Sequence, residues 1–206
     1  AAGEDTGGVH GANRLGGNGV ANSTVFGGIA GDTMGAWVPR EGAFVEPDEA
    51  VLDAALAATL APFARPVGAI SPIRDALHAL MWDKAGILRD ATALAEAASG
   101  LDALEAELDE TGVPDGTRGF NMTWQDWLNL KSLLLVSRSI VTAAGAREES
   151  RGAHWREDFP DTKPETDHLA STIVTLRDGR IALDWQPVRF TRVRPGESLL
   201  SAQAAE

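Results

Sequence analysis

Residues 8–18 read Gly-Val-His-Gly-Ala-Asn-Arg-Leu-Gly-Gly-Asn, and an apolar run from Val20 to Ala30 follows them. This pattern predicts a glycine-rich turn that leads into a buried helix of about four turns. The free N–H groups and the positive dipole end at the start of such a helix suit an anion or an electron-rich ring edge. The glycines let a flat ligand approach the main chain, and the guanidinium of Arg14 suits a carboxylate. By spacing alone, a plain glycine-rich turn with one surface arginine explains the segment equally well.

The middle of the chain is rich in alanine and leucine at helical spacing. Residues 47–49, Pro-Asp-Glu, are a helix-start signal and predict a helix to about Leu60 that ends at the prolines that follow. Residues 71–72, Ser-Pro, start a second run with one apolar face. It is expected to reach Gly100, with a brief extension to Leu108.

A further helix is expected from Thr123, with Asp126 completing a variant capping box, to about Gly145. This segment is apolar nearly all round, which predicts a central position. Three long helices with short breaks predict an antiparallel bundle. Tryptophans Trp124 and Trp127 lie at helical spacing and are expected in its core rather than on a binding surface.

The end of the chain carries a β-hairpin signal. Residues 171–176 and 181–185 are rich in β-branched and apolar side chains, and they flank Asp178-Gly179. Residues 188–193 are a candidate third strand. The expected fold class is therefore mainly α: a glycine-rich turn and helix, an antiparallel three-helix bundle, and a short C-terminal hairpin.

Composition excludes several functions. The chain has 206 residues and a net charge of −12, which argues against nucleic-acid binding because phosphate neutralisation needs a basic surface. It has no cysteine, so disulfides, zinc–thiolate sites and cysteine-held iron–sulfur clusters are excluded within it. A reducing cytoplasm is the default compartment. No apolar run is long enough to insert into a membrane. The four histidines, His10, His78, His154 and His168, are scattered, so no metal site is expected.

Two motifs resemble a known family. The segment 8–18 closely resembles the flavin- and substrate-binding segment of succinate dehydrogenase/fumarate reductase flavoproteins. Residues 147–160, Arg-Glu-Glu-Ser-Arg-Gly-Ala-His-Trp-Arg-Glu-Asp-Phe-Pro, look like the signature at the end of that family's helical domain. The resemblance implies three parts: 1–46 from the FAD-binding domain, 47–160 as the helical domain, and 161–206 as a hairpin and tail packed on it.

The resemblance also implies roles for individual residues. Arg14 matches the arginine that grips a substrate carboxylate beside the flavin, and Glu4 matches an acid that hydrogen-bonds the flavin. Asn18, Gly19 and Val20 fall in the segment that contacts the FAD ring through its backbone. Gly19 and Val20 depart from the Ser-Leu pair of the membrane-bound enzymes, so a side-chain hydroxyl contact is lost.

The same resemblance implies that the chain is incomplete as a catalyst. A strand followed by Gly-x-Gly-x-x-Gly is absent, and the family's proton-donating arginine and flavin-linking histidine lie upstream of this segment. No catalytic residue is therefore assigned here, and the chain by itself is expected to be inactive. The implied partners are the remainder of the flavoprotein, a dicarboxylate substrate and an iron–sulfur subunit. The implied location is the cytoplasm, peripheral to the inner membrane through partner subunits.

Two alternatives remain open. One is a segment of an L-aspartate oxidase, which shares the His-Gly-Ala-Asn-Arg motif and a helical C-terminal domain. The other is a non-catalytic module whose bundle docks an iron–sulfur partner. Within the second motif, Ser150 and His154 lack a third orienting group, which disfavours a nucleophile–base pair. Its charged residues are expected to form an ion-pair network at a helix end: Glu149, Arg151, Arg156 and Asp158.

Overall fold

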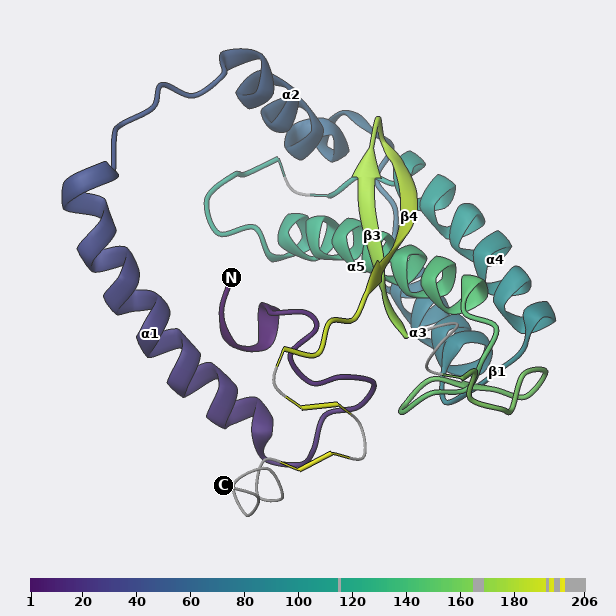
Figure 1. Cartoon of the computed structure of the whole chain (residues 1–206). Helices are drawn as coiled ribbons and strands as arrows, with labels where there is room; N and C mark the ends of the chain where they lie inside the picture. Colours follow the sequence, from purple (N-terminus) through teal and green to yellow (C-terminus); the bar gives the residue numbers. More distant parts are fainter. Residues whose placement is uncertain (115, 165–168, 192, 195–196, 199–206) are drawn as a thin grey trace. The chain divides into compact units, whose positions relative to one another are not determined.

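The computed structural model describes every residue of the chain except 115, 165–168, 192, 195–196 and 199–206. The chain divides into two units, Ala1–Thr162 and Lys163–Glu206. The first unit contains, in chain order, the turn η1 (Gly3–Asp5), α1 (Asn18–Glu41), α2 (Glu49–Leu60), the turn η2 (Ala61–Ala64), α3 (Ser71–Ala85), β1 (Leu88–Arg89), α4 (Ala91–Glu110), α5 (Met122–Ala146) and β2 (Trp155–Arg156) (Figure 1). The second contains β3 (Ala170–Arg177) and β4 (Arg180–Pro187).

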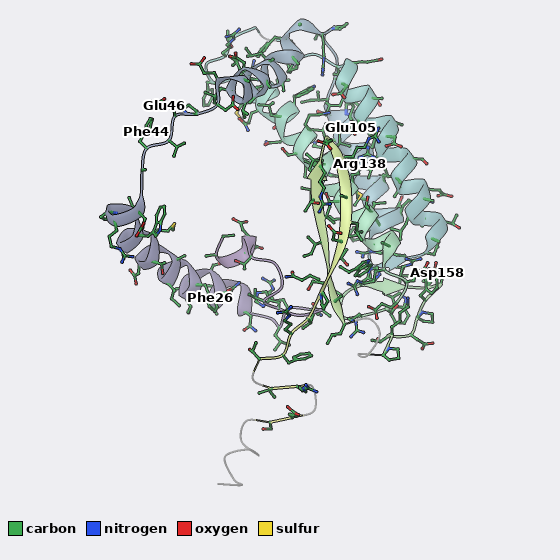
Figure 2. The ribbon with its side chains drawn as sticks, turned by 45° about the horizontal axis from the view of Figure 1, so that its top comes forward. Phe26, Phe44, Glu46, Glu105, Arg138 and Asp158 are labelled. Atoms are coloured by element: carbon green, nitrogen blue, oxygen red, sulfur yellow. The ribbon has the colours of Figure 1, made fainter. Side chains whose placement is uncertain are left out.

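Helices α3, α4 and α5 pack on one another and enclose the hydrophobic core. Apolar residues at helical spacing turn inward from each helix; the largest fully buried ones are Ile73, Leu77, Leu101, Leu108, Leu130 and Leu134. At the surface, Arg138 of α5 donates hydrogen bonds to Asp102 (2.6 Å) and Glu105 (2.9 Å) of α4. Figure 2 shows Arg138 and Glu105 facing each other. The expected mainly α fold with a three-helix bundle is confirmed.

The sequence interpretation of residues 71–108 as one continuing helical run is wrong. The run is two helices, because α3 ends at Ala85 and α4 begins at Ala91. The side chain of Asp90 accepts a hydrogen bond from the backbone N–H of Ala93 at 2.8 Å and so caps α4. Gly100 does not end a helix either. It lies inside α4, where an added Cβ would be 2.7 Å from a methyl carbon of Leu80, so the glycine lets α3 approach closely.

Helix α5 begins one residue before the expected start. Its cap is Asn121, whose side chain accepts from the N–H of Trp124 at 2.9 Å, so Thr123 is not the capping residue. The helix is not central: it buries one face and leaves Leu135 and Val136 exposed. The expected core position of the tryptophans holds for Trp127, which is buried. Trp124 is half-buried and packs against the core.

Helices α1 and α2 contribute little to this core. Helix α2 matches its predicted bounds and is capped by Asp48, which accepts from the N–H of Ala50 at 2.9 Å. Helix α1 is longer than expected and is not buried: of its described residues, Asn22 alone is buried, while Phe26 and Trp37 are about half exposed. No helix in the described part of the chain is long and apolar enough to cross a membrane.

The second unit is the predicted β-hairpin. Strands β3 and β4 pair antiparallel from Ala170 with Pro187 to Arg177 with Arg180. Asp178 and Gly179 both have positive φ, 51° and 73°, as a two-residue hairpin turn requires. The described residues of 188–193 form no strand, although the N–H of Val188 still donates to the Leu169 carbonyl at 3.0 Å. The proposed third strand is therefore absent there, and residue 192 lies outside the described residues.

Candidate functional site

The glycine-rich segment forms an irregular turn that ends at the first residue of α1. Gly17 precedes the helix with φ 81°, a left-handed conformation that favours glycine, and no side chain caps the helix start. The first N–H groups of an α-helix have no acceptor within the helix. The N–H groups at Asn18 to Val20 are thus presented at an uncapped, positive helix end.

Arg14 lies against this helix start. Its guanidinium occupies the space that a side chain on Gly19 would fill: an added Cβ would be 3.1 Å from the guanidinium carbon and would overlap one of its nitrogens. The side chain is exposed, and no carboxylate in the described part of the chain pairs with it. Arg14 therefore presents an unneutralised cation beside the positive end of α1, an arrangement that favours an anionic ligand.

The turn η1 is fixed to the same end of α1 by Asn22. Its side-chain amide donates to the Gly3 carbonyl at 3.0 Å and lies 3.4 Å from Nε2 of His10. Sequence reasoning missed Asn22; a polar residue inside an apolar helical run was the available signal. Glu4 is exposed on η1, and the hydroxyl of Thr6 is buried without a hydrogen-bond partner among the described residues.

The structure therefore gathers the predicted binding residues around one helix start. Arg14 touches Gly19, and Asn18 and Val20 belong to the same helical turn. Glu4 reaches this region through η1 rather than by direct contact with Arg14. Gly19 is partly buried and the other four are exposed, so the site is an open wall and not an enclosed pocket.

The second motif builds a buried ion-pair network after α5, as predicted. Glu149 is 0% exposed, and its carboxylate lies 2.6 Å from a guanidinium nitrogen of Arg147 and 3.0 Å from one of Arg151. These two arginines neutralise a carboxylate that burial would otherwise protonate.

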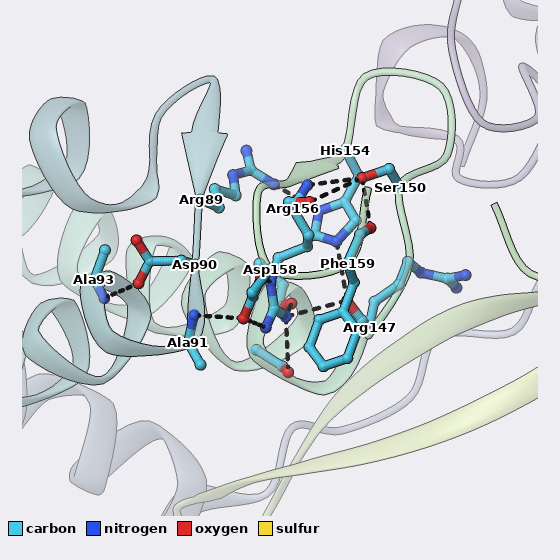
Figure 3. Close-up of polar contacts among 12 residues, drawn as sticks. Arg89, Asp90, Ala91, Ala93, Arg147, Ser150, His154, Arg156, Asp158 and Phe159 are labelled. Carbon is cyan, nitrogen blue, oxygen red and sulfur yellow. Dashed lines mark hydrogen bonds and ion pairs between the residues drawn. The ribbon is translucent and has the colours of Figure 1, made fainter. Parts of the chain in front are cut away.

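Arg156 forms the other half of the network and joins two helix ends. It is 1% exposed and donates to the carbonyl of Ala144 at 3.0 Å, near the end of α5. Its guanidinium also makes two 2.8 Å bonds to Asp158, whose carboxylate accepts from the N–H of Ala91 at the start of α4 (Figure 3). Hydrogen bonds from Arg156, and secondarily from Ala91, lower the pKa of Asp158 to about 2.

This low pKa predicts an acid-sensitive contribution to stability. The ordinary pKa of the carboxyl is 3.8, so Asp158 stabilises the folded chain above that pH, and the gain is lost as pH falls toward about 2. We expect Asp158→Asn to be less stable than the parent in urea at neutral pH, with the gap shrinking as the pH is lowered through this window. Asp75→Asn, at an exposed pair 3.6 Å from Arg74, is the matched control. A gap that persists undiminished at the acid end would contradict the assignment.

Ser150 and His154 do not form a nucleophile–base pair. The hydroxyl of Ser150 donates to the Phe159 carbonyl at 2.9 Å and accepts from the N–H of Arg156 at 2.9 Å. His154 is bonded elsewhere, to Arg89 and to the Arg147 carbonyl (Figure 3). Both side chains are structural. The described residues contain no group of His, Cys, Asp and Glu side chains that could hold a metal ion, and His168 lies outside them.

Comparisons with known proteins identify the family. The family model described as fumarate reductase flavoprotein C-term matches residues 74–199, which is more than half of the chain. The bundle and hairpin are thus the C-terminal domain of a flavoprotein. The chain belongs to the succinate dehydrogenase/fumarate reductase flavoprotein family, as its two motifs predicted.

Individual relatives agree with this assignment. The chain is 39% identical over 171 residues to a fumarate reductase (CoM/CoB) of Methanothermobacter marburgensis, covering 80% of this chain and 30% of that protein. It is 35% identical to the fumarate reductase flavoprotein of Mycobacterium tuberculosis, covering 92% of this chain and 34% of that protein. A structure of Mycobacterium smegmatis Sdh1 in complex with UQ1 superposes with a TM-score of 0.82 at 31% identity, covering 95% of this chain and 33% of that one. The chain therefore spans about a third of the length of the relatives it matches.

Proposed function

We propose that this chain forms one wall of the flavin and substrate site in a longer flavoprotein that interconverts succinate and fumarate or a related dicarboxylate. The observation that carries the proposal is the unneutralised guanidinium of Arg14 at the uncapped start of α1. Membership of the family supports it, since the curated relatives include fumarate reductase flavoproteins.

The residues present fit FAD as the cofactor. Backbone N–H groups at Gly19 and Val20 have no capping side chain, and they can hold the electron-rich edge of a flat ring. The buried Thr6 hydroxyl lacks a partner in the described part of the chain, and the nearby Glu4 carboxylate is free to accept a hydrogen bond. Bound FAD supplies the hydride chemistry, and the polypeptide supplies orientation and charge.

In this proposal the residues of the chain bind and orient. Arg14 holds one substrate carboxylate through two parallel N–H···O bonds, which fixes the carbon skeleton relative to the start of α1. The positive end of α1 stabilises negative charge that develops nearby. Proton donation and dinucleotide binding belong to the rest of the flavoprotein, so the isolated chain has no turnover.

The exposed apolar side chains of α1 support a division into parts. Val25, Phe26 and Trp37 are about half exposed on a helix that buries one side chain among its described residues (Figure 2 labels Phe26). We propose that residues 1–46 belong to the FAD-binding domain and that its remaining chain covers this surface. Residues 47–160 are then the helical domain and 161–206 a hairpin and tail packed on it. An iron–sulfur subunit is the proposed electron partner, and it would attach the flavoprotein to the inner membrane from the cytoplasm.

The test is substitution of Arg14 in the complete flavoprotein. Arg14→Met removes both carboxylate bonds, and we expect kcat/KM for fumarate to fall about 100-fold or more, with Arg14→Lys retaining part of it. Arg40→Met, at an exposed arginine near the other end of α1, is the control. Flavin content, read from visible absorbance, should stay at the parent level in all three variants.

Two outcomes would change the assignment. Fumarate turnover that survives Arg14→Met at nearly the parent rate would remove the substrate role of the arginine. Oxidation of L-aspartate by the parent protein, with no reaction of succinate or fumarate, would favour the aspartate oxidase alternative instead.

A further inference from the structure

The two family motifs, far apart in the sequence, meet at one backbone contact. The N–H of Ala153 donates to the carbonyl of Ala12 at 3.3 Å. Gly152 lies against the same peptide group: an added Cβ would be 2.5 Å from the Ala12 carbonyl carbon and would overlap its oxygen. Gly152 also has φ 59°, which disfavours any other residue. Ala12 is two residues before Arg14, so this contact fixes the main chain that carries the guanidinium.

The turn that makes this contact is closed on itself. Arg151 and His154 exchange two backbone hydrogen bonds, N–H to carbonyl, at 2.9 Å and 3.1 Å. The Arg151 guanidinium is held by the buried carboxylate of Glu149. Residues 151–154, which we term the positioning turn, therefore have little freedom to adjust if Ala12 shifts.

His154 ties the positioning turn to the bundle. Its Nδ1 lies 3.0 Å from a guanidinium nitrogen of Arg89, and its Nε2 lies 3.1 Å from the Arg147 carbonyl (Figure 3). A guanidinium only donates and a carbonyl only accepts, so the ring is neutral, with its proton on Nε2. Burial, reinforced by the charges of Arg89, Arg147 and Arg156, lowers the pKa of His154, although the carbonyl bond opposes this.

Arg89 continues the link into α3. Its Nε donates to the carbonyls of Ala85 at 3.1 Å and Gly86 at 2.7 Å, at the C-terminal end of that helix. A continuous set of hydrogen bonds thus runs from α3 through Arg89 and His154 to the positioning turn, and from there to Ala12.

We propose that the positioning turn sets the location of Arg14, with Gly152 and His154 as positioning residues for substrate binding. The helical domain then acts on the carboxylate site through the backbone of residues 10–14 and not by touching the substrate. This inference rests on the proposed function of Arg14. Its physical basis is that a catalytic or binding group displaced by about 1 Å loses much of its effect.

Gly152→Ala in the complete flavoprotein is the direct test. The added methyl must displace Ala12, so we expect the dissociation constant of a dicarboxylate inhibitor such as malonate, and KM for fumarate, to rise about tenfold or more. We also expect faster hydrogen–deuterium exchange of the amides in residues 10–16. Gly179→Ala is the matched control: it has the same left-handed backbone, φ 73°, but no atom within 4 Å of the added carbon. It imposes the same strain without reaching Ala12.

A second pair of variants separates positioning from folding. His154→Gln keeps one acceptor and one donor, whereas His154→Leu leaves Arg89 and the Arg147 carbonyl without this partner. We expect the leucine variant to repeat the rise in KM and the faster exchange at residues 10–16, and the glutamine variant to restore both toward the parent.

The outcomes are distinct. Unchanged KM, inhibitor binding and exchange in both Gly152→Ala and His154→Leu, relative to Gly179→Ala, would overturn the positioning role. If Gly152→Ala does not fold, the two His154 variants decide, and equal behaviour of leucine and glutamine would count against the proposal. A parent-like Arg14→Met would instead overturn the proposed function while leaving the exchange result at residues 10–16 intact.

Discussion

Replacing Arg156 by methionine is expected to lower the free energy of unfolding by about 3–5 kcal/mol, measured by urea denaturation of the chain. The guanidinium is 1% exposed and bonds three backbone carbonyls at the end of α5, those of Ala144, Gly145 and Arg147. Methionine fills part of the volume but donates no hydrogen bond. The carbonyls and the Asp158 carboxylate then lose their partner in a region closed to water.

The control for this prediction is an exposed arginine pair. Arg177 contacts Asp184 at 2.8 Å on the hairpin, with both side chains more than half exposed. Arg177→Met should cost less than about 1 kcal/mol because water replaces the lost contact. Equal effects of the two substitutions would show that burial of Arg156 contributes nothing, and the account of the α5 end given above would then be wrong.

Local signals in the sequence predicted those elements whose ends are marked by turn or capping residues. Asp48 caps α2, and Asp178-Gly179 makes the hairpin turn, as expected. The break between α3 and α4 was missed because apolar spacing continues across it. Asp90 was the available signal, but a single capping residue inside an apolar run is weak.

The expected burial of α1 failed for a different reason. Its apolar residues record contacts made in the longer flavoprotein, and the described chain has too little structure to cover them. The same limit applies to the site. Arg14 and Gly19 were predictable from the motif and its resemblance, but the contact of Gly152 with Ala12 is not, because no periodicity or spacing links residues so far apart.

The bundle core leads to the last prediction, on Leu101 of α4. This side chain is 0% exposed and lies in the core cluster next to Gly100, where α3 and α4 approach most closely through Leu80. We expect Leu101→Ala to lower the free energy of unfolding by about 2–5 kcal/mol in the same urea measurement, because the lost transfer energy adds to that of a cavity that cannot collapse.

Leu135→Ala is the matched control, since it makes the same change in a helix at a side chain that is 46% exposed. It should cost no more than about 1 kcal/mol. A small effect at Leu101 would mean that the helices readily move together to fill the space. Such a mobile α4 could not hold Asp90 and Ala91 in place for Asp158 and Arg156, so a large loss at Leu101 is also what a rigid ion-pair network at the helix ends requires.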